Sequence, residues 1–256
     1  MIAKVFLLGL LVAASCASPL TSTVNYADAL KTYLEAFKKM APCGYAAENI
    51  PVLDPLINAF TAFNYTRGET SIVGNASNIR ISGLSNFVIL KGEYDPNTLR
   101  ASFDILFPEI QILGSTIMEG VFNMLGFTFP MRQNTLLNER LQQLRIVGEY
   151  TFAQSLSSPN GLRLTDLKLQ FYLADVKIDN WDTLLNISTN NYLESITRET
   201  VLALVKEIQP RVDQLYTKYV LPDVNDLLSA VNMTQLTNYF VNTANNWNSA
   251  NCNVMA

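Results

Sequence analysis

The feature of this sequence that most constrains its fold is a long region, residues 99–178, in which apolar and polar side chains alternate. The apolar members of these runs are Leu99, Ala101, Phe103, Ile105, Phe107, Ile110, Ile112, Leu144, Ile146, Tyr150, Phe152, Leu167, Leu169, Phe171, Leu173, Val176 and Ile178. Because successive side chains of a β-strand point to opposite faces, the alternation predicts antiparallel strands with one buried face. The phase slips after Pro108, which predicts a bulge that bends and coils the sheet.

Other signals in the same region indicate where strands break and turn. Residues 117–129 form a further strand-like region, which Gly120 and Gly126 interrupt. Pro159-Asn160-Gly161 predicts a hairpin turn between the last two runs. Since the predicted strands are longer than the usual five or six residues, we expect the sheet to curl, with a helix as its filling.

Helical periodicity precedes the strand region. Residues 24–40 carry one apolar stripe at spacings of three and four, which predicts an amphipathic helix that covers a core. The stripe consists of Tyr26, Leu30, Tyr33, Leu34 and Phe37. Ser22 or Thr23 is expected to cap the helix, and Pro42 and Gly44 are expected to end it.

Helical periodicity returns after the strands, over residues 190–221, with a broad apolar face. This face consists of Leu193, Ile196, Leu204, Ile208, Leu215 and Tyr219, flanked by Val201, Val205, Val212, Tyr216 and Val220. Pro210 is expected to kink this helix. A third helix is expected over residues 224–231, and the Asn- and Thr-rich residues 232–256 are expected to form a loosely ordered tail.

The order of these elements predicts the fold class. A run of strands bracketed by helices favours α+β and disfavours a parallel α/β fold. We therefore expect a long, strongly coiled antiparallel sheet wrapped around the long C-terminal helix, in one domain that spans residues 18–231.

Composition excludes several classes of function. The chain contains no histidine, so Ser-His-Asp triads, Cys-His pairs and histidine-containing metal sites are excluded. The patterns typical of nucleotide-binding loops and of hydrolase nucleophiles do not occur either. A carboxylate pair of the glycosidase type is formally open, but 22 acidic residues contain such pairs by chance. We expect neither enzyme activity nor a cofactor nor a metal. A net charge of −4 argues against nucleic acid as a partner.

Residues 1–17 have the pattern of a secretory signal peptide. Lys4 precedes an apolar run over residues 5–14 that is too short to span a bilayer. Small residues at Ser15 and Ala17 predict cleavage after Ala17. An N-terminal core helix is a weaker interpretation because the run has no polar face. A lipoprotein site at Cys16 is weaker too, because Ala13 stands where leucine is usual. We expect a secreted protein without stable membrane insertion.

Export would make two kinds of modification available. Cleavage leaves Cys43 and Cys252, which favours one disulfide, although two free thiols or a bridge to another chain are alternatives. The sequence also contains N-glycosylation sequons, at Asn64, Asn75, Asn186 and Asn232.

Three motifs, in this order, carry a resemblance to a known family. They are Ile50-Pro51-Val52-Leu53-Asp54-Pro55-Leu56; the strand over residues 79–90, broken at Gly83; and the segment over residues 106–114, which contains Phe107-Pro108. Together they resemble the insect takeout and juvenile-hormone-binding protein family. The resemblance implies a tubular lipid-binding fold with an elongated pocket between sheet and helix. Members of that family carry a cysteine pair near the mature N-terminus, whereas this chain has Cys43 alone there.

The resemblance implies a secreted carrier of a terpenoid or a fatty acid. The candidate residues for lining its pocket are Phe103, Phe107, Phe122, Phe127, Phe129, Phe171, Trp181, Leu185, Val205 and Ile208. For each of these, a plain core position is the competing interpretation. Tyr150, Tyr172 and Tyr216 are candidate polar groups near the ends of the pocket. The alternative function is a secreted structural or surface-active protein on the same scaffold, with its core filled by its own side chains.

Overall fold

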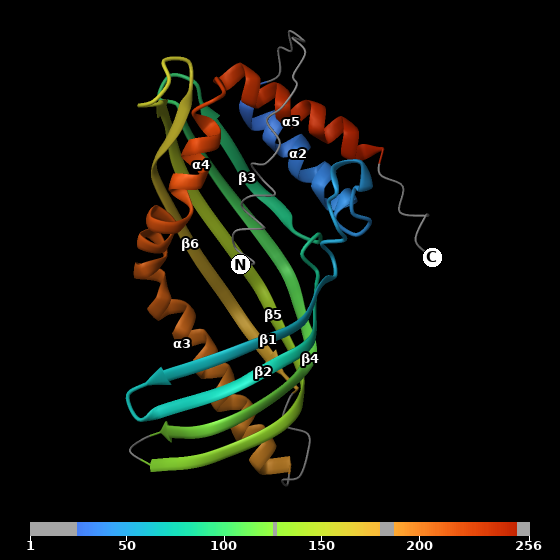
Figure 1. Ribbon diagram of the computed structural model, residues 1–256, viewed down its shortest axis with the longest axis vertical. Helices are drawn as coiled ribbons and strands as arrows, with labels where there is room; N and C mark the ends of the chain where they lie inside the picture. The colour runs from blue at the N-terminus through green and yellow to red at the C-terminus, as the bar shows by residue number, and fades with distance from the viewer. Residues whose placement is uncertain (1–24, 125–126, 180–186, 250–256) are drawn as a thin grey trace.

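The computed structural model describes residues 25–124, 127–179 and 187–249. At its centre lies one six-stranded sheet, which is elongated and coiled (Figure 1). The strands are β1 (Leu56–Arg67), β2 (Thr70–Ser82), β3 (Val88–Asp95), β4 (Arg100–Met124), β5 (Phe127–Gln154) and β6 (Leu162–Ile178). All pairings are antiparallel, in the order β1-β2-β4-β5-β6, with β3 paired to β4 outside this path.

The alternation in the sequence corresponds to the longest strands, β4 with 25 residues and β5 with 28. The predicted change of phase after Pro108 is confirmed by burial, because Phe107 and Ile110 are both buried although they lie three residues apart. The register of β4 on β5 is nevertheless the same on both sides of this point, from Phe107–Leu144 to Glu109–Gln142. Gln143 of β5, next to the partner of Phe107, has a φ of 54°. The inward- and outward-facing positions therefore switch in both strands at the same place. The expected bulge, an extra residue in one strand alone, does not occur between β4 and β5.

The helices are α2 (Tyr26–Met40), α3 (Ile187–Tyr219), α4 (Leu221–Leu228) and α5 (Met233–Asn248), with a short 3-10 turn over Ala46–Glu48. Figure 1 shows α2 and α5 side by side at one end of the sheet and α3 running along β6. The predicted α+β class, with a coiled antiparallel sheet and a long C-terminal helix, is confirmed. Pro210 lies inside α3 and does not end it.

Two expectations about helix ends were wrong. The cap of α2 is Asn25, whose side chain accepts a hydrogen bond from the backbone N–H of Asp28 at 3.0 Å. Neither Ser22 nor Thr23 has this role. The residues expected to form a loose tail contain α5, which begins at a capping box formed by Asn232 and Gln235. Its apolar face packs on α2, where the rings of Tyr33 and Trp247 are in tilted contact with their centres 4.7 Å apart.

One strand has no clear signal in the sequence. The apolar residues of β1 do not alternate, and Ile57 and Phe60 are each 61% exposed. Within the part of the chain that the structure describes, β1 is an edge strand that pairs only with β2. An edge strand with exposed apolar side chains lacks the one-sided burial that produces a period of two, so the pattern could not reveal it.

Polar side chains of α3 and α4 complete the free edge of β6. The Gln209 side chain accepts a hydrogen bond from the Phe171 N–H at 2.7 Å and donates one to the Leu169 carbonyl at 2.7 Å. The Asn225 side chain accepts from the Leu164 N–H at 2.7 Å and donates to the Leu164 carbonyl at 3.3 Å. Each amide thus offers one donor and one acceptor to the edge, as a neighbouring strand would.

The three sequence motifs that carry the family resemblance contact one another. The buried Asp54 carboxylate accepts hydrogen bonds from the backbone N–H of Gly83 at 2.9 Å and of Ser85 at 2.7 Å. The Phe87 ring lies 5.7 Å from the ring of Phe107. Gly83 has a φ of 91°, and a Cβ there would lie 2.4 Å from the Glu109 carbonyl oxygen. Only glycine fits this break between β2 and β3.

Over the described residues, no helix has both the length and the apolar character needed to cross a membrane.

Candidate functional site

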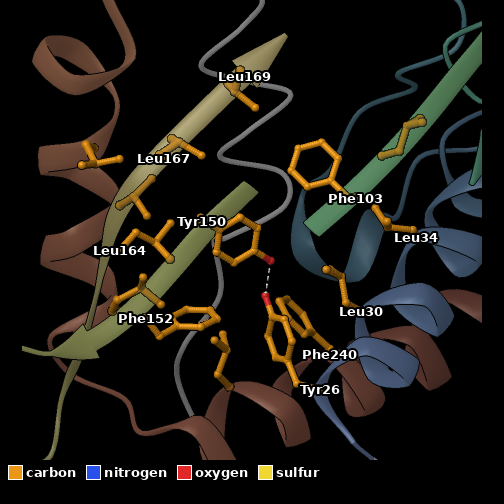
Figure 2. Close-up of a pocket in the computed structure, with 15 residues that line it drawn as sticks. Tyr26, Leu30, Leu34, Phe103, Tyr150, Phe152, Leu164, Leu167, Leu169 and Phe240 are labelled. Carbon is orange, nitrogen blue, oxygen red and sulfur yellow. Dashed lines mark hydrogen bonds between the residues drawn. The ribbon is translucent and has the colours of Figure 1, made fainter. Parts of the chain in front are cut away.

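An apolar cavity of ≈ 140 Å³ lies between the helices at one end of the molecule and the sheet (Figure 2). Helices α2, α4 and α5 and strands β4, β5 and β6 supply its walls. The lining residues are Tyr26, Leu30, Leu34, Phe103, Ile105, Tyr150, Phe152, Leu164, Leu167, Leu169, Leu221, Val224, Leu228, Leu236 and Phe240. All of them are aliphatic or aromatic, so the cavity favours an apolar occupant.

A pair of tyrosines supplies the polar groups of the cavity. The hydroxyls of Tyr26 and Tyr150 are hydrogen-bonded at 2.7 Å, and both side chains are buried. A hydrogen bond between two hydroxyls uses one of their hydrogens and leaves the other. Among the described residues, neither hydroxyl has a further hydrogen-bond partner. One O–H group of the pair is therefore available to an acceptor inside the cavity.

Aromatic packing holds this pair in place. The Tyr26 ring meets Phe152 edge-on at 5.3 Å and lies 5.0 Å from Tyr94. The Tyr150 ring also meets Phe152 edge-on, at 5.4 Å. Rings in tilted and edge-on contact have little freedom to rotate, so the position of the free hydroxyl hydrogen is constrained from both sides.

Burial keeps both hydroxyls neutral. Loss of solvent raises the pKa of Tyr26 well above its usual range, and the nearby Tyr150 raises it further. Burial raises the pKa of Tyr150 to about 12, against a lowering by its hydrogen bond with Tyr26. Near neutral pH the pair is a hydrogen-bond donor and not a charged site.

Beside the main cavity, a smaller space of ≈ 20 Å³ opens between α2 and the strands β3 and β4. Tyr26, Leu30 and Tyr150 line both spaces. The smaller one also has Lys31 and Lys91 in its wall. Lys91 is paired with Glu93 at 2.9 Å. The apolar cavity thus adjoins a rim that contains cationic side chains.

The structure places the pocket residues predicted from the sequence in different parts of the molecule. Phe103 lines the cavity. Phe107 is buried in the core and contacts Phe87. Phe171 on β6 and Val205 on α3 are half-buried, and Ile208 on α3 is 46% exposed. None of the four lines this cavity. Val205 and Ile208 belong to α3, whereas its helical walls come from α2, α4 and α5.

The structure describes no side chain for the other five predicted pocket residues. Phe122, Phe127 and Phe129 belong to the paired ends of β4 and β5, where only the backbone is described. Trp181 and Leu185 lie outside the described residues.

The three candidate tyrosines lie in different surroundings. Tyr150 lines the cavity. Tyr172 is exposed, with the Arg145 guanidinium 5.9 Å from its ring centre. Tyr216 on α3 is half-buried, and this burial raises the pKa of its hydroxyl.

Sequence reasoning missed the helical half of the cavity. Tyr26, Leu30 and Leu34 were assigned to a stripe that covers the core, and periodicity cannot distinguish a core wall from a cavity wall. Leu236 and Phe240 were placed in the tail. Asn232 and Gln235, three residues apart, with apolar residues recurring at 236, 240, 244 and 247, were a readable signal for α5.

The sequence pattern of the haemolymph juvenile hormone binding proteins matches residues 6–238. This range covers most of the chain. The chain belongs to this family. No curated protein sequence matches it.

Two solved structures are reported as similar to this chain. The crystal structure of Takeout 1 from Epiphyas postvittana is similar over 82% of this chain and 96% of that chain, with a TM-score of 0.50 and 14% sequence identity. A crystal structure of lipopolysaccharide binding protein matches 76% of this chain and 38% of that chain, with a TM-score of 0.33 and 11% identity. The similarity to Takeout 1 shows that this chain has the takeout fold.

Proposed function

We propose that this protein is an extracellular carrier that holds one small hydrophobic molecule, a juvenile-hormone-like terpenoid or a fatty acid, and performs no catalysis. The observation that carries the proposal is the apolar cavity, whose walls offer a single pair of neutral hydroxyls. Transfer of apolar surface out of water contributes about 25 cal/mol per Å², so binding needs no chemistry at the ligand. The name of the family, haemolymph juvenile hormone binding protein, supports a ligand of this class.

The size of the cavity limits what it holds without movement. A volume of ≈ 140 Å³ is close to that of cavities that bind one benzene ring, whereas drug-sized ligands occupy roughly 300–1,000 Å³. We therefore propose that one end of the ligand occupies the cavity and that outward movement of α2, α4 or α5 admits the rest.

The polar groups suggest how ligands are oriented. The free hydroxyl of the Tyr26–Tyr150 pair suits an ester, ketone or ether oxygen. An ionised carboxylate in the same place would have no cationic partner and would be costly to bury. The carboxylate of a fatty acid fits the rim, where Lys31 lies and where it would compete with Glu93 for Lys91.

The experiment compares two charged substitutions in protein that has been stripped of lipid. Leu167→Asp places a carboxylate in the cavity wall on β6, and Val205→Asp places one at a half-buried position of α3, away from the cavity. Leu167→Asp should abolish micromolar binding of fluorescent terpenoid and fatty-acid probes, and Val205→Asp should retain it. Circular dichroism of both variants checks that each is folded.

Two outcomes would contradict the proposal in different ways. If Val205→Asp abolishes binding and Leu167→Asp does not, the ligand lies between the sheet and α3. If folded wild-type protein binds neither probe, the carrier function is wrong, and a structural or surface-active role on the same scaffold replaces it. Organic extraction of the native protein, followed by mass spectrometry, tests the same distinction.

We also propose that the chain is exported and cleaved after Ala17. Residues 1–24 lie outside the described part, so the proposal depends on the sequence pattern and on the family's occurrence in haemolymph. The secreted protein should begin at Ser18, and an N-terminus at Met1 would contradict export.

A further inference from the structure

One face of the sheet carries an exposed apolar patch, formed by Phe60, Val73, Ile117 and Leu136. Their side chains are 61%, 47%, 50% and 73% exposed, respectively. They lie on β1, β2, β4 and β5, in the half of the sheet away from α2 and α5 (Figure 1). Thr116, the neighbour of Ile117 on the opposite face, is buried. The patch therefore belongs to the outer face. Val73, Ile117 and Leu136 are diagonal neighbours on adjacent strands, and Ser77 and Ser115 lie between Phe60 and Leu136. Apolar side chains gathered on an exposed face often mark a surface that is covered.

The register of the strands places all four residues on one face. Phe60 pairs with Ser77, which pairs with Ser115, which pairs with Leu136. Residues that are directly opposite on antiparallel strands point to the same side of the sheet. Residues two apart along a strand share a face as well, so Val73 and Ile117 lie on the face of Phe60 and Leu136.

The sequons Asn64 and Asn75 lie on this same face. Asn64 of β1 is directly opposite Val73 of β2. Asn75 of β2 is directly opposite Ile117 of β4. Opposite residues on antiparallel strands have Cβ atoms about 4.5–5.5 Å apart. Each sequon asparagine therefore adjoins one of the exposed apolar side chains, and a sugar on it would extend over the patch.

Both asparagines have room for a sugar. Asn64 is exposed. Asn75 is partly exposed, and its other neighbour across the strands is the small, exposed Ala62. Asn232 differs, because it caps α5 and lies on another element. Asn186 lies outside the described residues.

The position of β1 gives this face a second reason to be covered. Among the described strands, β1 pairs with β2 alone, so its other edge is open to pairing with a further strand. Open edges with exposed apolar side chains promote association between chains. A branched sugar at Asn64, in the second half of this strand, would obstruct both edge pairing and stacking of the patch.

We propose that Asn64 and Asn75 both carry N-linked glycans and that these glycans cover the patch, which keeps the protein monomeric. The proposal rests on the proposed export of the chain, since N-glycans are added in the secretory route. It does not depend on what the cavity binds, so a protein without a ligand could still be shielded in this way.

The first measurement is made on protein secreted from insect cells. Peptide mass spectrometry should find glycans on both Asn64 and Asn75. The double variant Asn64→Gln/Asn75→Gln should associate with increasing concentration in analytical ultracentrifugation and should bind more of a dye that fluoresces on apolar surfaces. The matched control is Thr234→Ala, which removes the sequon of Asn232 and keeps its capping side chain; this variant should stay monomeric.

A second experiment distinguishes glycans that cover the patch from glycans that are needed for folding. Enzymatic removal of glycans from the folded wild-type protein should produce the same association without any new folding step. Adding Phe60→Ser and Leu136→Ser to the double variant should restore the monomer, because the two most exposed apolar side chains of the patch are then polar. Absence of glycans from both sites in the secreted protein would overturn the proposal. So would a deglycosylated, folded protein that remains monomeric with unchanged dye binding.

Discussion

At the scale of single residues, the Tyr26–Tyr150 pair decides what the cavity can recognise. A free phenolic O–H inside an apolar wall favours a ligand that brings an acceptor, because an unmatched donor there has lost its hydrogen bonds to water. The same pair discriminates little between hydrocarbon tails. Recognition at this site therefore concerns the polar end of the ligand.

The double variant Tyr26→Phe/Tyr150→Phe tests this role. It keeps both rings in edge-on contact with Phe152 and removes both hydroxyls, because either hydroxyl alone could still donate a hydrogen bond to the ligand. Affinity for an ester-bearing terpenoid should fall by about 2- to 13-fold, which corresponds to about 0.5–1.5 kcal/mol for one hydrogen bond. Affinity for a hydrocarbon probe of the same length, measured by fluorescence titration, should not change. An equal loss for both probes would show that neither hydroxyl contacts the ligand.

The raised pKa of Tyr150 also predicts a dependence of stability on pH. The folded protein holds this proton up to a pKa of about 12, whereas an unfolded chain loses it near pH 10. Its contribution is therefore fully present below pH 10 and is lost as pH rises from 10 through 12. Between pH 9 and pH 12 the free energy of unfolding of Tyr150→Phe should therefore fall by about 2 kcal/mol less than that of the wild type. Urea unfolding across this range measures the difference, and parallel curves would contradict the assignment.

At the scale of elements, amide side chains join the helices to the edge of the sheet. Asn225 belongs to α4, which supplies Leu221, Val224 and Leu228 to the cavity wall, while its amide is bonded to Leu164 of β6. This arrangement fixes α4 relative to β6 and closes the cavity on that side. The edge strand is at the same time protected from other chains.

Asn225→Leu should therefore destabilise the protein by about 1–3 kcal/mol, because the Leu164 backbone groups lose their partners. The matched control is Asp226→Leu, an exposed position of the same helix, which should change stability by less than about 0.5 kcal/mol. Chemical denaturation gives both values. Hydrogen exchange at the Leu164 amide should accelerate in the first variant alone, and equal exchange in both would show that this hydrogen bond is not important.

The packing of α2 on α5 supports the predicted disulfide between Cys43 and Cys252. The Lys39 ammonium donates a hydrogen bond to the Asn248 side chain at 3.2 Å, which joins the C-terminal ends of both helices. Cys43 follows α2 closely, and Cys252, outside the described residues, comes four positions after Asn248. Thiol-alkylation mass spectrometry without reductant should find both cysteines protected. Alkylation of both would contradict the bridge.

At the scale of the whole molecule, the cavity couples ligand binding to stability, since its walls come from both ends of the chain. A ligand at one hundred times its Kd should stabilise the fold by about 2.7 kcal/mol. For a chain of this size the melting temperature should rise by about 5–10 °C. Leu167→Trp, which fills the cavity with an indole ring, should remain folded, and its melting temperature should not rise when the ligand is added. A full rise in this variant would place the ligand elsewhere.

Much of the fold could be predicted from the sequence, because side-chain periodicity reports one-sided burial. The alternation between residues 99 and 178 belongs to strands, the stripe over residues 24–40 belongs to a helix, and Asp54, Gly83 and Phe107 belong to motifs that meet. The edge strand β1 could not be predicted, since Ile57 and Phe60 face solvent. Helix α5 could have been predicted from the box of Asn232 and Gln235, but its polar composition concealed it.

The α+β class, the family and the apolar character of the interior follow from the amino-acid sequence alone, because they depend on local periodicity and on short motifs. Which apolar residues line the cavity depends on how distant parts of the chain pack together. Leu30, Phe103 and Leu236 belong to different parts of the chain and share no pattern, yet α2, β4 and α5 bring them around one space. A periodic stripe states that a face is buried but not what covers it, and an incomplete cover is what makes a cavity.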